Sequence, residues 1–350
     1  MKIGKYTIGI DHPPFIIAEM SGNHNQSIER AIEIIDAAAA AGAHAIKLQT
    51  YTADTITIPH DKDLFFIKDE NSLWKGQSLY ELYNKAHTPW EWHKPLFDHA
   101  IKKGIIPFSS PFDETAVDFL ETLHVPAYKI ASFENNHIPL LKKVAKTGKP
   151  VIVSTGLSNK ETIKEAVDTL KENGCKNIVL LKCTSSYPAS SENSNLVTIP
   201  DIRQRFQCEV GLSDHTMGIG APIAAIALGA RVIEKHFTLR RSDGGVDAAF
   251  SLEPEELKAL VIESERAFLS LGKVSYDIQE DEKRSMQFKR SIYVIKSLRK
   301  GDVLTEKNIR IIRPGGGLHP RYFNDLLNKK LACDVEAGTP ASWDMIANNN

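Results

Sequence analysis

The chain has 350 residues, of which 42% are hydrophobic and 25% are charged, and its formal net charge is −1. These totals are typical of a soluble globular protein and argue against a nucleic-acid partner. No apolar run reaches the roughly 18 residues of a membrane span, and the N-terminus lacks a signal-peptide pattern. The four cysteines form no CxxC pair, so we expect a cytoplasmic protein with reduced thiols and no membrane partner.

Short runs rich in apolar and β-branched residues recur between residues 15 and 237 and predict strands. In chain order they are FIIAEM (15–20), AIKLQT (45–50), GIIPFSS (104–110), PAYKIAS (126–132), PVIVSTG (150–156), NIVLLKCTS (177–185), CEVGLSDH (208–215) and RVIEKHF (231–237). Segments with helical periodicity lie between most of them. This alternation favours an α/β fold, a (β/α)8 TIM barrel. A doubly wound open sheet is the alternative, but the segment after the first strand lacks its glycine-rich fingerprint.

Two of the helical segments carry recognisable ends. SIERAIEIIDAAAAAGA begins at Ser27 and SNKETIKEAVDTLKENG begins at Ser158, and both serines are predicted N-caps. Gly42 and Gly174 lie where each of these patterns stops, so both are predicted to end their helices.

Two stretches depart from the barrel pattern. Residues 52–90 separate the second strand from its helix, and we interpret them as a substrate-facing lid; a plain surface excursion is the alternative. After residue 272 the sequence changes to short strands with turn residues. We therefore predict a catalytic barrel at 1–275, a linker at 276–288 and a small β-rich domain at 289–350.

Polar residues occur at nearly every predicted strand end, where barrel enzymes place their active sites. Charged side chains are rarely buried unless they are paired, so packing alone does not explain this distribution. We infer that lysines and hydroxyls from several strands hold a small, multiply charged anion, a phosphate ester with a carboxylate. Ion pairs between these lysines and barrel carboxylates are the alternative. The residues concerned are Lys47, Ser110, Lys129, Ser132 and Ser154.

His215 and His236 end adjacent predicted strands. The spacing of strands predicts imidazoles about 5–7 Å apart, close enough to share one metal ion. With Glu19 and waters, the ligands would be nitrogen and oxygen, which suits Mn²⁺, Mg²⁺, Co²⁺ or Fe²⁺. Two unrelated structural histidines are the alternative.

Two further motifs carry weaker signals. RPGGGLHP is rich in glycine but is not a P-loop. We interpret it as a flexible segment that lets Arg313 or His319 reach a neighbouring surface, with a plain turn as the alternative. Asp247, in the loop after the last strand, is available as an acid or a hydrogen-bond acceptor.

The ordered set AEMSGNHNQS, AIKLQTYT, PFSSPFD, YKIAS, VSTG, LKCTSSYP, GLSDHT, EKHFTL and FSLEP resembles the sialic acid synthases, (β/α)8 enzymes with a C-terminal antifreeze-like (SAF) domain. SLWKGQSLYELYNKAHTPWEWH and RPGGGLHPRYF are most similar to the pseudaminic branch of that family. The resemblance implies condensation of phosphoenolpyruvate with an acetamido sugar, 2,4-diacetamido-2,4,6-trideoxy-β-L-altrose in that branch, with release of phosphate. A synthase of N-acetylneuraminate or legionaminate, acting on another hexosamine, is the alternative.

The resemblance also implies residue roles. His215 and His236 would bind the divalent metal, usually Mn²⁺, with Mg²⁺ or Co²⁺ as alternatives, and Glu19 would be the catalytic carboxylate that handles water. Phosphoenolpyruvate would contact Lys47, Ser110, Lys129, Ser132, Ser154 and Thr184. The sugar would contact Gln49, Tyr187, Glu234, Asp247, Phe288 and Arg313.

Arg313 matches an arginine that the C-terminal domain contributes to the partner's active site, which implies a domain-swapped homodimer. Two positions depart from the family pattern: Thr184 stands where the sialic branch usually has Asn, and TLRRSDGGVDAAF is more basic than usual. Outside this family, a Schiff-base aldolase using Lys47 or Lys129 and a carbohydrate- or ice-binding protein remain competing hypotheses.

Overall fold

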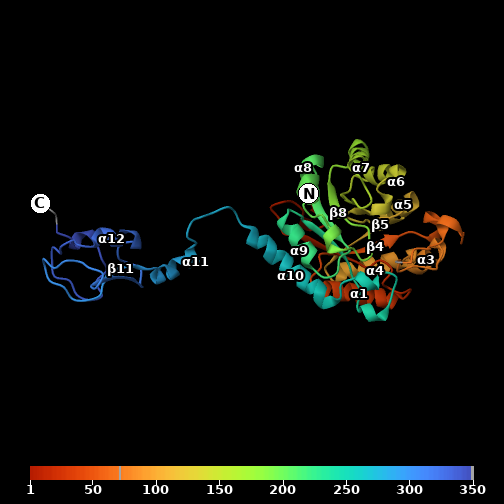
Figure 1. Ribbon diagram of the computed structural model, residues 1–350. Coiled ribbons are helices and arrows are strands. Elements are labelled where there is room, and N and C mark those ends of the chain that lie inside the picture. Colours follow the sequence, from red (N-terminus) through yellow and green to blue (C-terminus); the bar gives the residue numbers. More distant parts are fainter. Residues whose placement is uncertain (71, 348–350) are drawn as a thin grey trace. The chain divides into compact units, whose positions relative to one another are not determined.

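The computed structural model describes residues 1–70 and 72–347, and it divides into two compact units, Met1–Gly272 and the chain from Lys273 onward (Figure 1). In the described part of the first unit, eight parallel strands close into a barrel, which confirms the predicted fold class. They are β3 (Phe15–Glu19), β4 (Ala45–Thr50), β5 (Ile106–Pro111), β6 (Tyr128–Ile130), β7 (Val151–Ser154), β8 (Ile178–Cys183), β9 (Glu209–Asp214) and β10 (Val232–His236).

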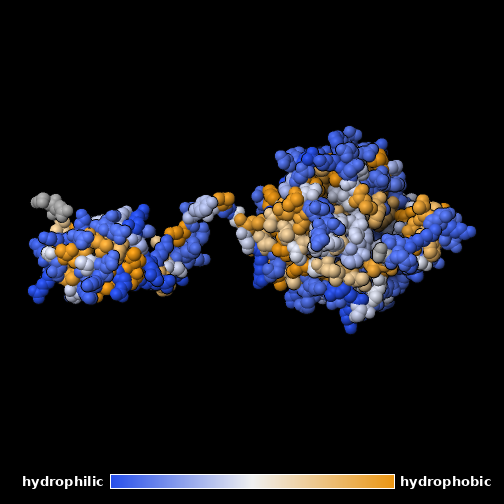
Figure 2. Space-filling view, in the orientation of Figure 1, coloured by the Kyte–Doolittle hydropathy of each residue, from blue (hydrophilic) through white to orange (hydrophobic). Residues whose placement is uncertain are grey.

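Helices surround the strands, as the alternating pattern requires (Figure 1). They are α1 (Ile28–Ala40), α4 (Trp90–Lys102), α5 (Glu114–Thr122), α6 (Ile138–Ala145), α7 (Lys160–Glu172), α8 (Thr198–Phe206), α9 (Gly220–Ala227) and α10 (Pro254–Leu271). Their apolar stripes and the outward-facing strand residues form one core, to which α1 contributes Ile34, Ile35 and Ala38. The surface over α7 is mainly hydrophilic (Figure 2), as expected for the outer face of an amphipathic helix.

A second core fills the barrel itself. Successive strand residues point to opposite faces, so Phe15 and Ile17 of β3 point inward together with Ala45 of β4 and Val232 of β10. The short hairpin of β1 (Lys2–Ile3) and β2 (Tyr6–Thr7) adds Ile3 to this inner core. The inward-facing positions nearer the carboxyl ends of the strands are left for polar side chains.

The predicted helix ends are confirmed except for one. The Ser27 hydroxyl accepts a hydrogen bond from the Arg30 backbone N–H and caps α1. Gly42 and Gly174 follow α1 and α7 with φ of 87° and 103°, left-handed values that favour glycine. The prediction for Ser158 is wrong, because Asn159 caps α7. The Ser158 hydroxyl instead contacts Asn135 and Gly156.

The insertion contains α2 (Ala53–Ile56) and α3 (Leu79–Ala86), separated by a stretch that is mostly irregular. In the second unit, the predicted linker contains α11 (Glu280–Lys283), and the strands β11 (Ser291–Val294) and β12 (Ile309–Ile312) pair antiparallel before α12 (Phe323–Leu326). This unit has its own small core, built on Ile292, Val294, Leu304, Ile309 and Leu331 among others. No helix in the described part of the chain is both long and apolar enough to span a bilayer.

Candidate active site

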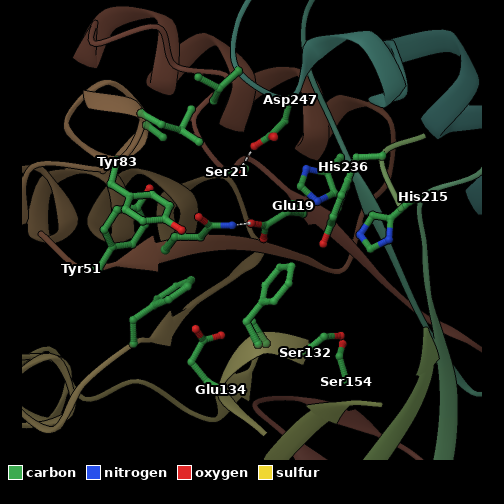
Figure 3. A pocket seen from close by; sticks show the side chains of 18 of the residues that line it. Glu19, Ser21, Tyr51, Tyr83, Ser132, Glu134, Ser154, His215, His236 and Asp247 are labelled. Atoms are coloured by element: carbon green, nitrogen blue, oxygen red, sulfur yellow. Dashed lines mark hydrogen bonds between the residues drawn. The ribbon is translucent and has the colours of Figure 1, made fainter. Parts of the chain in front are cut away.

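A cavity of about 500 Å³ opens at the carboxyl ends of the barrel strands (Figure 3). The strands contribute charged and hydroxyl groups to its lining, and the insertion after β4 contributes mostly apolar and aromatic groups. Among the apolar and aromatic lining residues from the insertion are Ile56, Ile67, Trp74, Leu79, Leu82 and Tyr83. The cavity therefore has a polar floor and an apolar side, the combination expected of a site for a small polar molecule with apolar substituents.

The structure brings most of the predicted site residues to this cavity. Those that line it are Glu19, Lys47, Gln49, Lys129, Ser132, Ser154, Tyr187, His215, Glu234, His236 and Asp247. Ser110 is fully buried and accepts a hydrogen bond from Lys47, 3.2 Å away. The Thr184 hydroxyl donates to the Asn193 carbonyl, and Thr184 is not part of the lining. Phe288 and Arg313 belong to the second unit.

The alternation of side chains along each strand explains which polar groups face the cavity. Glu19 lies two residues after the inward-facing Ile17, and Glu234 and His236 follow Val232 at the same spacing. The intervening Lys235 points to the other face and forms a buried ion pair with Asp214 at 2.8 Å. The strand-end charges thus fall into two sets, one in the cavity and one between the barrel and its helices.

Four buried charges form a connected network at the cavity floor. Lys47 Nζ lies 2.6 Å from Glu19 Oε2 and 3.9 Å from Glu234 Oε2, and Lys129 Nζ lies 3.3 Å from Glu234 Oε1. Gln49 Nε2 donates to Glu19 Oε1 at 2.9 Å. These are the ion pairs that the alternative interpretation of the lysines anticipated, but the same groups also line the cavity and are available to a ligand.

The two carboxylates of the network differ in acidity. Burial raises the pKa of Glu19 to about 7 against the pull of Lys47, and the nearby Glu234 charge adds to the rise. Burial also disfavours the charged form of Glu234, but Lys129 and Lys47 together hold its pKa below the ordinary value. Glu234 therefore stays ionised, whereas Glu19 can take up or release a proton near neutral pH.

Next to the lysines, hydroxyls and a backbone amide form a cradle. The Ser132 hydroxyl accepts a hydrogen bond from the Gly156 N–H at 3.2 Å, and the buried Ser154 hydroxyl has no hydrogen-bond partner within the described residues. A Cβ at Gly156 would lie 2.6 Å from Ser132 Oγ and 2.1 Å from Ser185 Oγ. Only glycine lets the backbone approach these hydroxyls so closely. The cradle suits an anion, with Lys129 as the counter-charge.

The two predicted metal ligands lie side by side (Figure 3). The His215 and His236 ring centroids are 5.3 Å apart, which confirms the spacing predicted for the two rings. His215 Nδ1 lies 3.0 Å from the Thr184 carbonyl, an arrangement that leaves its Nε2 for a ligand. Burial and the neighbouring His215 lower the pKa of His236 well below the ordinary value, and its buried Nδ1 has no hydrogen-bond partner among the described residues.

Burial lowers the pKa of His215, but the Cys183 thiol and the Thr184 carbonyl outweigh it and raise this pKa above the ordinary value, so a cation there would compete with a proton. The open Nε2 of His215 and the buried Nδ1 of His236 are nitrogen atoms that suit a divalent cation. Across residues 1–70 and 72–347, no group of three or more His, Cys, Asp or Glu side chains is arranged to hold a metal. Glu19 is instead engaged with Lys47 and Gln49. The remaining positions around a cation at the histidines would therefore be filled by solvent or by substrate oxygens.

Some lining residues were missed by the sequence analysis. Glu134 follows Ser132 in a short 3-10 helix and points into the pocket (Figure 3); burial raises its pKa to about 7. Its position just beyond a predicted strand end was a usable signal. Ser21, whose hydroxyl donates to the Asp247 carboxylate, also follows a strand. Tyr51 directly follows β4, and Tyr83 lies in the insertion that was interpreted as a substrate-facing lid. Both line the pocket, although neither was named as a site residue from the sequence.

The comparison with known families identifies the class of protein: the chain belongs to the NeuB family, whose model matches residues 34–276. Residues 289–347 match the SAF domain. The chain is similar to the pseudaminic acid synthase of Campylobacter jejuni, with 45% identity over 338 residues that cover 97% of each chain. It is also similar to the pseudaminic acid synthase of Helicobacter pylori, with 42% identity over 336 residues that cover 95% of this chain and 98% of that protein.

Among solved structures, the chain resembles an N-acetylneuraminic acid (sialic acid) synthetase from Leptospira borgpetersenii in complex with citrate. The TM-score is 0.72 at 33% identity, over 82% of this chain and 95% of that one. These likenesses confirm the predicted family, its C-terminal SAF domain and the similarity to the pseudaminic branch.

Proposed function

We propose that this protein is a pseudaminic acid synthase. It would condense phosphoenolpyruvate with 2,4-diacetamido-2,4,6-trideoxy-β-L-altrose and water, and would release pseudaminic acid and phosphate. The observation that carries the proposal is the pairing of the anion cradle with two converging imidazoles in one cavity, in a chain 45% identical to an enzyme with that name.

The cradle suits phosphoenolpyruvate because that substrate carries a phosphate and a carboxylate. Lys129, Ser132 and Ser154 supply one ammonium and two hydroxyls, and Lys47 supplies a second ammonium beside Glu19. Bound there, the enol would be held by charge-assisted hydrogen bonds, which are stronger than neutral ones. The apolar side of the cavity would receive the methyl groups of the sugar.

The reaction needs two bonds to form and one to break. C3 of phosphoenolpyruvate attacks the aldehyde carbon, whose oxygen takes up a proton. Water then adds at C2 with loss of a proton, and the C–O bond to phosphate breaks. Glu19, with a pKa of about 7, is suited to accept the proton of that water, while Lys47 holds its carboxylate in place.

His215 and His236 would hold the divalent metal, Mn²⁺ or alternatively Mg²⁺ or Co²⁺, which when bound polarises the sugar aldehyde as a Lewis acid. The buried Nδ1 of His236, which has no hydrogen-bond partner in residues 1–70 and 72–347, supports this role. Gln49, Tyr187, Glu234 and Asp247 are proposed sugar contacts.

We also infer a domain-swapped homodimer in which Arg313 and Phe288 of one subunit complete the sugar site of the other, with Thr184 as a further contact to phosphoenolpyruvate. The exchange of domains and the Thr184 contact are both inferred from the similarity to the family. The free thiols of the described cysteines are in keeping with a cytoplasmic location.

The test is phosphate release with a panel of sugars. The 2,4-diacetamido-trideoxy-altrose should be turned over with the highest kcat/KM, and N-acetylmannosamine and the legionaminate precursor with lower values. Preference for either of the other sugars would assign the chain to the alternative branch. Borohydride trapping of a lysine together with activity that survives EDTA would instead favour the aldolase hypothesis.

A further inference from the structure

The apolar side of the cavity ends at a thin wall. Trp74, from the insertion, and Val246, from the loop after β10, both line the main cavity. The same two residues also line a second cavity of about 460 Å³. Trp74 and Val246 therefore form the wall between the two cavities.

Specific contacts hold this wall closed. Trp74 Nε1 donates to the Val246 carbonyl at 2.8 Å. The wall also rests on Gly22, where a Cβ would lie 2.3 Å from Val246 Cγ2 and 3.1 Å from the Ala86 backbone. The loop after β10 and the insertion are thus packed against each other with no space for an added methyl group.

The wall lies close to the reacting end of the site. The Trp74 ring contacts Tyr187 with centroids 5.6 Å apart, and Tyr187 contacts His215 at 4.5 Å. A single ring therefore separates the wall from His215. A sugar whose aldehyde lies at the histidines would extend its substituents towards Trp74.

Both sides of the wall carry apolar as well as polar side chains. The lining of the main cavity includes Ile67, Leu79 and Leu82, which suit a methyl group. The second cavity is lined by Leu73 and Ala249 as well as by Asn25 and Gln77, so it offers apolar surface to a longer acyl chain. A substituent longer than acetyl would meet the wall before it could reach this space.

We propose that Trp74 and Val246 set the largest N-acyl group that the sugar substrate can carry. This inference rests on the proposed function and adds the residues that decide between sugars with short and long acyl groups. Removal of the Trp74 ring would join both cavities into one channel, so that a propanoyl or butanoyl group could extend into the second cavity.

The experiment measures kcat/KM by phosphate release with the diacetamido sugar and with analogues in which one acetyl, at either amino position, is replaced by propanoyl or butanoyl. Because one methylene changes discrimination by about 10–200-fold, Trp74→Ala should raise the extended-to-acetyl ratio at least about tenfold at one of the two positions. The change should lie in KM for the sugar, with KM for phosphoenolpyruvate unchanged.

Val246→Ala thins the wall from its other side and should raise the ratio less, in the same direction; it decides the question if Trp74→Ala does not fold. Leu64→Ala is the matched control, because Leu64 lies in the same insertion, is 93% exposed and lines neither cavity. An unchanged ratio in the wall variants, with the acetyl sugar still turned over, overturns this inference alone. Absence of phosphate release by the unsubstituted enzyme with every sugar overturns the proposed function as well.

Discussion

Glu19 is the residue at which the chemistry of the site is most directly tied to burial. It is 1% exposed, and its carboxylate contacts one ammonium and one amide, from Lys47 and Gln49. Burial disfavours the charge and the ammonium favours it, so the pKa settles at about 7. A group with this acidity can exchange a proton at neutral pH, which a surface glutamate cannot.

The pH dependence of catalysis should follow from these carboxyls. Glu19 and Glu134 both have a pKa raised to about 7, so below that pH both become protonated and neither can accept a proton. We expect kcat/KM to fall as the pH decreases through about 7. Glu19→Gln should lower kcat by about 10²- to 10⁴-fold, while the exposed control Glu33→Gln should not. A profile that stays flat through about pH 7 would contradict the role given to Glu19.

A second prediction at the residue scale concerns metal binding by His215 and His236. His215→Ala or His236→Ala should leave the fold intact, and the dissociation constant for Mn²⁺ should rise by more than about 100-fold, the upper effect of outer-shell partners. Titration calorimetry with Mn²⁺, alongside circular dichroism, measures both. His60→Ala, at an exposed position, is the control. Unchanged Mn²⁺ binding in either variant would rule out the shared site.

At the scale of elements, the turns after neighbouring strands hold each other's groups in place beside the cavity. β7 ends at Ser154 and the chain then passes Gly156, whose N–H donates a hydrogen bond to the hydroxyl of Ser132, beyond β6. Two neighbouring turns thus make one cradle. The insertion after β4 acts differently, because it adds most of the apolar and aromatic side of the cavity.

Gly156→Ala tests the cradle. The new Cβ would overlap the Ser185 and Ser132 hydroxyls, and because small displacements at a binding site are costly, KM for phosphoenolpyruvate should rise at least about tenfold. Steady-state kinetics with varied phosphoenolpyruvate measures this. Gly220→Ala is the control, since nothing lies within 4 Å of a Cβ there. Equal KM values in the two variants would mean that the hydroxyls do not hold the substrate.

At the scale of the whole molecule, the chain is two units with separate cores. The barrel holds the described cavity, and the second unit carries Arg313 and Phe288. The segment between α10 and α11 is exposed, and Tyr276 within it is 98% exposed. In the proposed domain-swapped dimer, this connection would link the barrel of one subunit to the unit that serves its neighbour.

Subunit mixing tests this arrangement. Arg313→Ala and Glu19→Ala should each be nearly inactive. A 1:1 mixture should regain up to about one quarter of full activity, because about half of the dimers would be mixed and half of the sites in each mixed dimer would be intact. Phosphate release after co-refolding or co-expression measures the recovery. Mixed dimers, verified by mass, that stay inactive would contradict the exchange of domains.

Much of this fold and site could be predicted from the sequence, because a barrel has two local patterns: strands alternate with helices, and polar residues end the strands. Alternating strand and helix patterns indicated the barrel, and polar residues at strand ends indicated Lys47, Lys129, His215 and His236. What tertiary structure alone decided is which strand-end charges face the cavity. Asp214 and Lys235 looked equivalent to their neighbours, but the pleat turns them outward into an ion pair. The wall of Trp74 and Val246 joins residues 172 positions apart, and no local pattern encodes such a contact.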